Sequence, residues 1–209
     1  DWENELSPFY DTAKKMLGAE KHPYLSRSDK AMQTLAEEMG NKEAFQKTDV
    51  AVYFGKPGET VTDPYFNGEG PGRTGCTLCG GCMLGCRFNA KNTLDKNYLF
   101  LAQKAGCEIK AETEVYDVIP LNSDGSIGYE IKFRSSLSWF PKKARIRTKA
   151  VIFAGGVLGT MNLLLKLKES SLPNLSEMLG KGVRTNSESL IGVTTYDKDV
   201  SFSEGIAIG

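Results

Sequence analysis

Four cysteines lie close together in the middle of the chain, in a spacing that could bind a metal centre. Cys76, Cys79, Cys82 and Cys86 follow the pattern C-x2-C-x2-C-x3-C, in which thiolates from one curled loop can reach an iron–sulfur cluster. Zinc fits less well, because a tetrahedral zinc usually takes two ligands from each of two separate knuckles, and the sequence has one. The competing interpretation is that these are small, reduced, buried cysteines packed beside glycines. The pattern leaves both interpretations open.

A glycine turn after Phe153 is the second segment whose residue types suggest chemistry. Residues 151–159 predict an apolar strand, a turn at Gly155 and Gly156, and the start of a helix. Glycines at such a turn let backbone N–H groups and the positive end of the helix approach a phosphate closely. Tight packing between strand and helix would account for the same glycines without a ligand, so both explanations stand at this point.

Few other residues suggest catalysis or a particular compartment. The one histidine, His22, lies between Lys21 and Pro23 in a predicted loop, and we interpret it as a surface residue and not as a base. Cys107 is distant in the sequence from the other four cysteines. Those four are too close together for disulfides between them to link distant segments, as the disulfides of small secreted domains do. The cysteine pattern therefore favours a reducing compartment or a bound inorganic centre, although neighbouring cysteines could also pair locally, and we expect a cytoplasmic protein.

The charge balance and hydropathy exclude some classes of partner. Lys and Arg together number 26, as do Asp and Glu, so the net charge is zero and no overall field attracts nucleic acid. The most apolar stretch, 150–165, is interrupted by glycines and polar residues and is too short to cross a bilayer. The first residues do not have the pattern of a signal peptide. We therefore expect neither a nucleic-acid partner nor a transmembrane segment.

Hydrophobic periodicity predicts the elements that position these segments. Helices are expected from Ser7 and Pro8 to Leu17, from about Ser28 to Met39, from a cap at Asn92 or Thr93 to Ala105, and over 158–168. Strands are expected over 49–54, 107–121, 128–134 and 144–154, the last running directly into the glycine turn. Residues 55–85 are dense in Gly, Pro, Asp and Asn, which predicts a long irregular loop.

Taken together, these segments resemble the glucose-methanol-choline (GMC) oxidoreductase family. The resemblance extends over nearly the whole chain and is weakest over 55–75. It rests on the segments 1–10 with Trp2 and Pro8, 85–99, Thr113-Glu114-Val115, Ala154–Thr160 and Leu172–Ser176. Residues 91–99 and 183–188 are most similar to the cholesterol-oxidase-like branch of that family.

The resemblance implies an α/β fold that forms part of a two-domain FAD-binding oxidoreductase. Its parts would be a β-meander, a strand–Gly turn–helix unit and a partly helical substrate-side region. Residues 1–92 would form the substrate-side region with the Cys-rich loop, and 93–209 part of the FAD-binding domain. Val115, Ala154, Gly155 and Gly156 would line the adenosine and pyrophosphate region of FAD. The implied activity is oxidation of the CH–OH group of an alcohol, with a sterol-like compound as a candidate substrate.

Two departures from the family pattern limit what this chain would do alone. Family members have a strand, a Gly-x-Gly-x-x-Gly turn and a helix that hold the pyrophosphate, and they close with a histidine and a second polar residue at the flavin. We identify neither feature between Asp1 and Gly209. We therefore expect an internal fragment that is inactive by itself and needs the remaining segments of its parent. Met161 and Lys168 also differ from the residues usual in the family, which leaves the substrate open.

Two alternatives remain at this stage. Some flavin dehydrogenases of this family carry an iron–sulfur centre, so the chain could instead be an electron-transfer module built on Cys76, Cys79, Cys82 and Cys86. A degenerate domain that keeps the fold without the reaction is the third interpretation.

Overall fold

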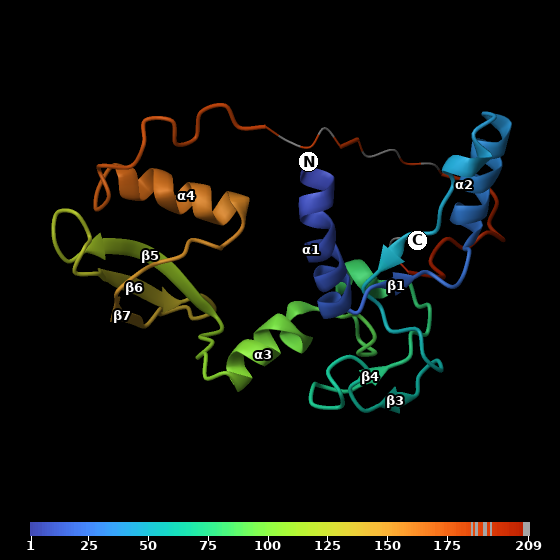
Figure 1. Ribbon diagram of the computed structural model, residues 1–209, viewed down its shortest axis with the longest axis horizontal. Helices are drawn as coiled ribbons and strands as arrows, with labels where there is room; N and C mark the ends of the chain where they lie inside the picture. The colour runs from blue at the N-terminus through green and yellow to red at the C-terminus, as the bar shows by residue number, and fades with distance from the viewer. Residues whose placement is uncertain (185, 187, 190–191, 193, 207–209) are drawn as a thin grey trace. The chain divides into compact units, whose positions relative to one another are not determined.

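The computed structural model describes residues 1–184, 186, 188–189, 192 and 194–206. It has mixed helix and strand content with small sheets and divides into two compact units (Figure 1). Unit 1 comprises Asp1–Glu108 together with Val193–Gly209, and unit 2 comprises Ile109–Gly192. Within the motif 183–188, Thr185 and Ser187 lie outside the described residues. None of the helices formed by the described residues is long and apolar enough to cross a bilayer.

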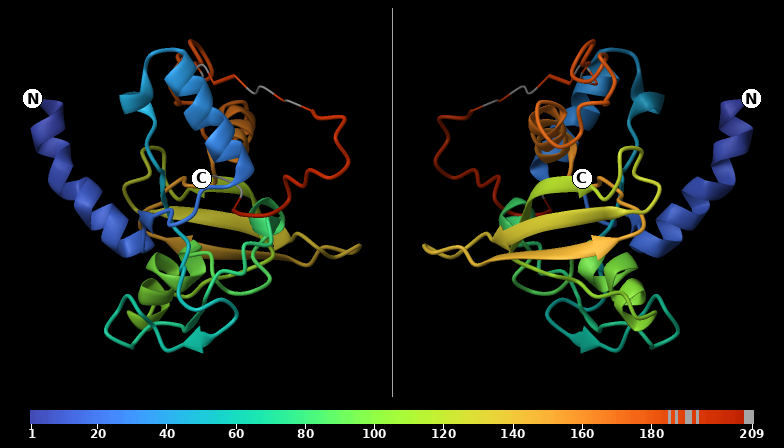
Figure 2. Two further views of the ribbon diagram at one scale, coloured as in Figure 1. Left: turned by 90° about the vertical axis from the view of Figure 1, so that its right-hand side faces the viewer. Right: turned by 90° about the vertical axis from the view of Figure 1, so that its left-hand side faces the viewer.

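The described residues of unit 2 form a three-stranded antiparallel sheet with one helix across it. The strands β5 (Thr113–Pro120), β6 (Tyr129–Ser135) and β7 (Lys143–Thr148) pair in the order β5-β6-β7. The register shifts between Val115 and Asp117, as at a β-bulge. Helix α4 (Val157–Lys168) lies along one face of the sheet and contacts β5 (Figure 2). This arrangement places the glycine turn, which precedes α4, beside the edge strand β5.

The core of unit 2 is apolar and joins the helix to the sheet. Val118 on β5, Ile131 on β6 and Leu167 on α4 are buried together, with exposed fractions of 1%, 8% and 2%. Val151 and Phe153 pack against this cluster, whereas Ile152 between them is exposed. The alternation is that of an extended chain, because successive side chains point to opposite sides. The segment before the glycine turn is therefore anchored by every second side chain.

Unit 1 contains two longer helices whose ends are set by side-chain caps. Helix α1 (Trp2–Leu17) is capped by the Asp1 carboxylate, which accepts a hydrogen bond from Glu3 N, and it ends at Gly18 in the left-handed conformation. Helix α2 (Arg27–Glu38) begins with a capping box: Ser26 and Asp29 each accept a hydrogen bond from the backbone N–H of the other.

The rest of unit 1 consists of short elements linked by loops. Strand β1 (Glu20–Lys21) pairs with β2 (Asp49–Val50), and β3 (Thr60–Val61) pairs with β4 (Arg73–Thr74). Single 3-10 turns occur at Lys42–Ala44, Gly81–Leu84 and Leu94–Lys96, and the last precedes helix α3 (Tyr98–Lys104). The segment 55–85, expected to be a long irregular loop, contains only β3, β4 and one of these turns.

A buried arginine organises this loop region. Arg73 is 1% exposed, and its guanidinium donates hydrogen bonds to Asn92 Oδ1 and to the backbone oxygens of Pro71, Gly72 and Lys96. A buried charge is costly unless its donors are satisfied, and here four acceptors surround it. Arg73 therefore ties the segments around residues 71, 92 and 96 to one point.

The structure corrects several predicted boundaries. Helix α1 begins at Trp2 and contains Pro8, because Asp1 and not Ser7 provides the cap. Helix α3 is capped by Asn97, beyond the predicted Asn92 or Thr93. The strand predicted over 107–121 begins only at Thr113, and the one predicted over 144–154 ends at Thr148. Residues 150–154 are extended but unpaired in the described sheets, and a strand requires a hydrogen-bonded neighbour.

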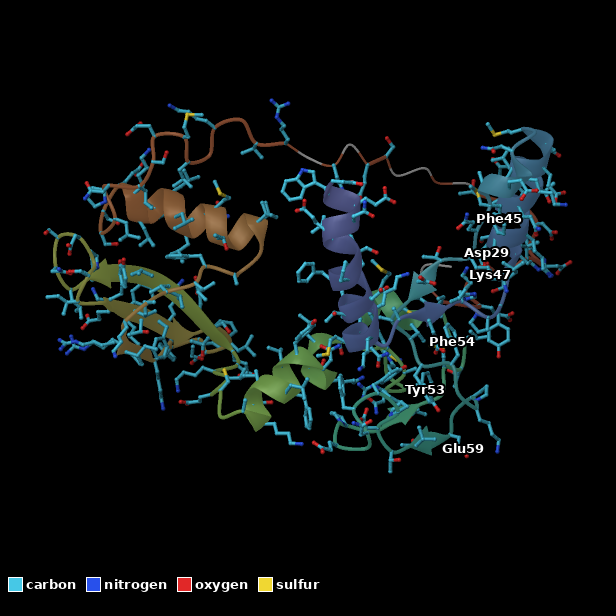
Figure 3. The ribbon with its side chains drawn as sticks, in the orientation of Figure 1. Asp29, Phe45, Lys47, Tyr53, Phe54 and Glu59 are labelled. Carbon is cyan, nitrogen blue, oxygen red and sulfur yellow. The ribbon has the colours of Figure 1, made fainter. Side chains whose placement is uncertain are left out.

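The surface position predicted for His22 is wrong. His22 is only 3% exposed. Its ring packs edge-to-face against that of Phe54, with the ring centroids 5.4 Å apart. Its Nδ1 lies within hydrogen-bonding distance of the backbone N and O of Tyr24. Phe54 is labelled in Figure 3. The strand pairing of β1 with β2 carries this histidine inward, which the loop-like sequence around Pro23 did not indicate. His22 is thus a packed residue of unit 1.

Candidate functional site

A cavity of about 630 Å³ in unit 2 connects β5 with the glycine turn. This volume lies within the range of roughly 300–1,000 Å³ usual for small-molecule and cofactor sites. Its lining comes from three segments: β5 with its neighbour β6, the extended chain 151–155, and one side of α4. The lining residues are Thr113–Tyr116, Val118, Ile131, Arg134, Val151–Gly155, Gly159, Thr160, Asn162, Leu163 and Lys166.

Three of the four predicted cofactor residues line this cavity. Val115, Ala154 and Gly155 come together there, although they are far apart in the sequence. Gly156 is not part of the lining and instead occupies the N-cap position of α4. As the outer strand of its sheet, β5 has one row of backbone N–H and C=O groups that the sheet does not pair. The backbone around Val115 could therefore hydrogen-bond to a planar ligand such as a purine.

The glycine turn is held open by its own backbone. Gly156 has φ 77° and ψ 162°, a conformation that only glycine adopts readily. Gly155 N donates to Thr160 Oγ1 at 3.2 Å, and Thr160 N donates to Gly156 O at 2.9 Å, which fixes the turn against the helix. A Cβ at Gly156 or Gly159 would meet no atom within 4 Å. Among the described residues, no side chain plugs this corner.

The charges at the cavity favour an anionic ligand. Arg134 donates two hydrogen bonds to Glu114, at 2.8 and 3.1 Å, and Lys166 also lines the cavity. Hydrogen bonding from Arg134, together with the nearby positive charges of Arg134 and Lys166, lowers the pKa of Glu114. Two cations and one carboxylate leave one positive charge in excess. The open N-terminus of α4 adds a partial positive charge.

One Gly-x-Gly-x-x-Gly spacing does occur in the chain, away from any predicted strand–turn–helix unit. Gly70, Gly72 and Gly75 have this spacing, but Arg73–Thr74 between them form the short strand β4, and no helix follows directly. Dinucleotide binding requires the turn to lie between a strand and a helix. This glycine spacing is therefore not the pyrophosphate-binding turn that the family pattern contains. For the described residues, the expectation that the chain lacks such a strand–turn–helix unit stays a prediction.

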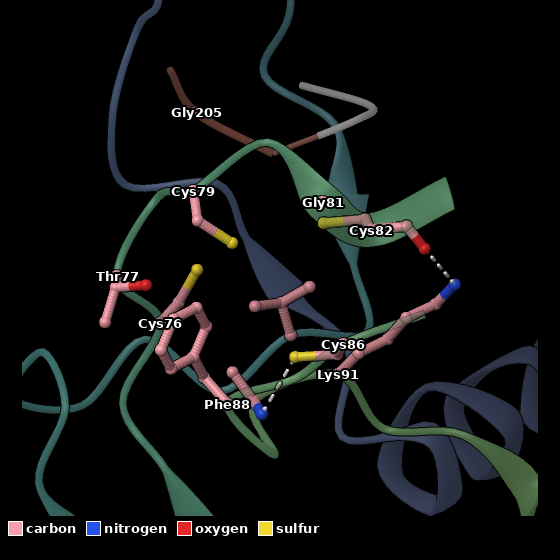
Figure 4. Close-up of a pocket in the computed structure, with 11 residues that line it drawn as sticks. Cys76, Thr77, Cys79, Gly81, Cys82, Cys86, Phe88, Lys91 and Gly205 are labelled. Atoms are coloured by element: carbon pink, nitrogen blue, oxygen red, sulfur yellow. Dashed lines mark hydrogen bonds between the residues drawn. The ribbon is translucent and has the colours of Figure 1, made fainter. Parts of the chain in front are cut away.

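The cysteine loop has a different geometry. Cys76, Cys79, Cys82 and Cys86 line one small cavity in unit 1, of about 10 Å³ (Figure 4). That volume corresponds to roughly one water molecule. Within the described part of the chain, no group of three or more His, Cys, Asp or Glu residues is arranged to hold a metal ion. The predicted iron–sulfur centre, and with it the electron-transfer module, therefore gains no support from this arrangement.

The two ends of the loop differ in the environment of their sulfur atoms. Burial raises the pKa of Cys76, and the three neighbouring thiols raise it further. Burial also opposes ionisation of Cys86, but hydrogen bonds from the backbone N–H groups of Lys91, Ala90 and Phe88 outweigh it, so the pKa of this thiol is lowered. The Cys86 thiolate is thus stabilised relative to that of Cys76.

Comparisons with known proteins match a family over the part of the chain that contains these segments. The GMC oxidoreductase family matches residues 72–185, which include β5, the glycine turn and α4. The chain is 49% identical to a cholesterol oxidase of Acinetobacter baumannii and 42% identical to one of Mycobacterium tuberculosis, each over 217 aligned residues. Both alignments cover the whole chain but only 39% and 37% of those proteins. No solved structure was found to match.

Proposed function

Because this chain belongs to the GMC oxidoreductase family, we propose that it is the middle section of an FAD-dependent enzyme that oxidises an alcohol. The observation that carries the proposal is the cavity joining Val115 to the turn at Ala154 and Gly155. Bound FAD would supply the ring that accepts hydride from the substrate carbon. The residues of this chain would hold the other end of the cofactor.

The proposed roles follow from the chemistry of the cavity. The unpaired edge of β5 at Val115 would hydrogen-bond to the adenine, and the apolar side chains of Val151 and Phe153 keep the extended segment in place beside it. The turn at Gly155 and Gly156 would allow close approach of phosphate to the N-terminus of α4. The excess positive charge at the cavity suits the same phosphate.

The proposal also assigns different roles to two regions of the chain. We propose that residues 93–209 contribute to the FAD-binding domain and that residues 1–92 form the substrate side. The relatives that match are cholesterol oxidases, which favours a hydroxylated, sterol-like substrate. The remaining segments of a longer parent protein would be the partners of this chain, and the cytoplasm its location.

The test compares the 209-residue chain with the full-length polypeptide proposed to contain it. We expect the full-length protein to be purified with FAD, seen as a flavin absorption spectrum and released cofactor, and the chain alone to bind FAD weakly or not at all. A full-length protein that folds but neither retains nor binds FAD would overturn the proposal. Tight, stoichiometric FAD on the isolated chain would contradict the interpretation as an incomplete section.

Gly155→Val supplies a sharper version of this test. A Cβ at Gly155 would make only ordinary contact, 3.6 Å from Thr160 Oγ1, so the backbone can accept a side chain that narrows the cavity. In the full-length protein we expect FAD affinity to fall by about tenfold or more, since each 1.4 kcal/mol corresponds to a factor of ten. Glu169→Ala, at the opposite end of α4, is the matched control and should leave affinity unchanged.

A further inference from the structure

The loop between β6 and β7 exposes large apolar side chains that the proposed flavin site does not use. Leu137, Trp139 and Phe140 are 71%, 97% and 89% exposed. Figure 2 shows this loop projecting beyond the end of the sheet. A local turn shapes it, because Ser138 Oγ donates a hydrogen bond to Phe140 O at 3.0 Å and accepts one from Phe140 N at 3.2 Å. Grouped apolar side chains of this kind mark an interaction surface, whereas single ones are common on any protein.

The strand that follows this loop is strongly basic. Its exposed cations are Lys142, Lys143, Arg145, Arg147 and Lys149. Residues 135–150 contain no Asp or Glu. Among the described residues, the carboxylate that pairs with these cations is that of Glu130, which lies 3.5 Å from Arg145 and 3.7 Å from Arg147. Five cations and one carboxylate leave four positive charges in excess beside the apolar loop.

The register of β7 places its cations on one face of the sheet. Ile146 lies opposite Ile131 of β6, and Ile131 is buried in the core beneath α4. Successive side chains of a strand point to opposite faces. Lys143, Arg145 and Arg147 therefore lie on the face that is turned away from α4. This basic face is separate from the side of the sheet on which α4 and the glycine turn lie.

From this combination we infer that the β6–β7 hairpin is a docking element for the surface of an anionic lipid bilayer. Trp139 and Phe140, with Leu137, enter the boundary between headgroups and acyl chains, where aromatic side chains are favoured. The cations of β7 lie against anionic headgroups, and each adds to the attraction. Their long apolar stems reach along the boundary while the charges stay in the headgroup layer. This inference does not depend on the proposed flavin site.

A bilayer suits the hairpin better than a nucleic acid does. A single-stranded nucleic acid would stack its bases on the aromatic rings, but the aliphatic side chain of Leu137 offers no ring for stacking. The chain as a whole has no net charge, so it lacks the overall field that draws polyanions over long distances. A bilayer accepts a projecting apolar loop without needing a pocket of matching shape, and the local cations complement its charge.

The first experiment measures sedimentation of the full-length polypeptide proposed to contain this chain with lipid vesicles. We expect it to sediment with vesicles of phosphatidylglycerol and phosphatidylcholine in equal amounts, and much less with phosphatidylcholine alone or at high salt. Trp139→Ala should weaken binding by about tenfold or more, because a large apolar side chain no longer enters the bilayer. Trp2→Ala removes an exposed tryptophan from α1 and should leave binding unchanged. Failure of the unmodified protein to bind anionic vesicles would overturn the inference.

Charge reversal separates local attraction from the effect of net charge. Lys142→Glu combined with Lys149→Glu should weaken binding to the anionic vesicles by about tenfold or more. Lys15→Glu combined with Lys30→Glu makes the same change of net charge at exposed positions of α1 and α2, and should have little effect. Equal losses in the two double variants would show that the hairpin is not the docking surface.

Fluorescence quenching by brominated lipids identifies the side chain that enters the bilayer. Trp139→Phe keeps an aromatic ring, so binding should persist while the quenched part of the tryptophan emission disappears. Quenching that persists in this variant would assign docking to another surface. Protection of Trp139 from acrylamide before vesicles are added would show that another part of the protein or a second copy covers it, and would also overturn the inference.

Two further measurements on the same preparations keep the interpretations apart. Binding of a single-stranded oligonucleotide that is lost in Trp139→Ala, without vesicle binding, would assign the hairpin to nucleic acid and contradict bilayer docking. Released FAD reports separately on the proposed function. Vesicle binding by a protein that folds without FAD would overturn the proposed function and support the docking element.

Discussion

The glycine turn of unit 2 and the cysteine loop of unit 1 both carry residue patterns typical of ligand binding, but they enclose very different spaces. The turn opens on a cavity of about 630 Å³, whereas the cysteine loop closes to about 10 Å³. The larger cavity is lined by helix α4, the sheet and the extended chain before the glycine turn. The smaller one is lined mainly by the side chains of the irregular loop itself.

The interior of each region is also stabilised by a different kind of interaction. Unit 2 depends on the apolar cluster of Val118, Ile131 and Leu167. The loops of unit 1 converge on the buried guanidinium of Arg73. Spacing in the sequence therefore identifies which chemical groups are present, and the kind of packing around them decides whether a ligand has space. Four substitutions test this contrast.

Arg73→Ala should have the largest effect. It removes hydrogen bonds to Asn92 and to three backbone oxygens inside the loop region. Since unsatisfied buried acceptors are costly, we expect the free energy of unfolding of unit 1 to fall by about 4 kcal/mol, measured by urea titration and circular dichroism. Arg87→Ala, at an exposed position of the same loop, should change it by less than about 0.5 kcal/mol. Equal effects of the two variants would show that Arg73 does not organise the loops.

Leu167→Ala probes the apolar counterpart in unit 2. The side chain is 2% exposed, so its truncation should cost about 3 kcal/mol by lost burial and an added void. Hydrogen exchange of β5 and β6 should accelerate while that of the Arg73 region stays unchanged. Leu158 lies on the same helix but is 81% exposed, so Leu158→Ala should change neither the free energy of unfolding nor the exchange rates. Faster exchange in both units would contradict separate stabilisation.

Gly156→Ala tests whether the open turn is built by its backbone. At φ 77° and ψ 162° an alanine is strained, so we expect a loss of about 2 kcal/mol in the free energy of unfolding. Gly155→Ala should cost little, because its backbone is unstrained and the added Cβ meets only Thr160. Thermal unfolding of the two variants supplies the measurement. Equal losses at both positions would mean that the turn owes its shape to packing and not to Gly156.

Glu114→Gln should give the smallest effect, and one that depends on pH. Hydrogen bonding from Arg134 lowers the pKa of Glu114 below its ordinary value of 4.5. A lowered pKa means that the ion pair contributes stability above the unfolded-state pKa and loses it as the pH falls through the folded-state pKa. Wild type should therefore be slightly more stable than the variant at about pH 7, and the two should converge in acid, as followed by urea titration. A difference that grows in acid would contradict this sign.

The sequence predicted the regular elements better than the boundaries and the site geometry. The periodicity of β5, β6 and α4 was sufficient because their apolar residues pack on one another within a short stretch of chain. The strand expected to continue over 149–154 was wrong, since pairing depends on a neighbour that local sequence does not specify. Burial of His22 was missed for the same reason: it depends on β1 pairing with β2 and on the distant Phe54.

The chemistry of the candidate sites was predictable to different depths. The proximity of Val115 to the glycine turn followed from the family resemblance and not from the residues alone. The cysteine spacing predicted that the four thiols lie close together, but it did not predict the volume of the cavity between them. That volume depends on the buried apolar residues Val52 and Ala90, which pack against the loop. The N–H groups directed at Cys86 come from the turn at residues 88–91, whose conformation neither hydrophobic periodicity nor cysteine spacing specifies.

Cys79 forms a parallel bridge with Gly205, and backbone hydrogen bonds link Gly80 N to Gly205 O and Gly205 N to Leu78 O. The cysteine loop is thus completed by a segment more than a hundred residues later, whereas unit 2 is continuous in the chain. During synthesis on the ribosome, unit 2 can fold as soon as it emerges, but the cysteine loop cannot pair with Gly205 until residue 205 has left the exit tunnel. Unit 1 therefore completes its fold after unit 2, although most of its residues are synthesised first.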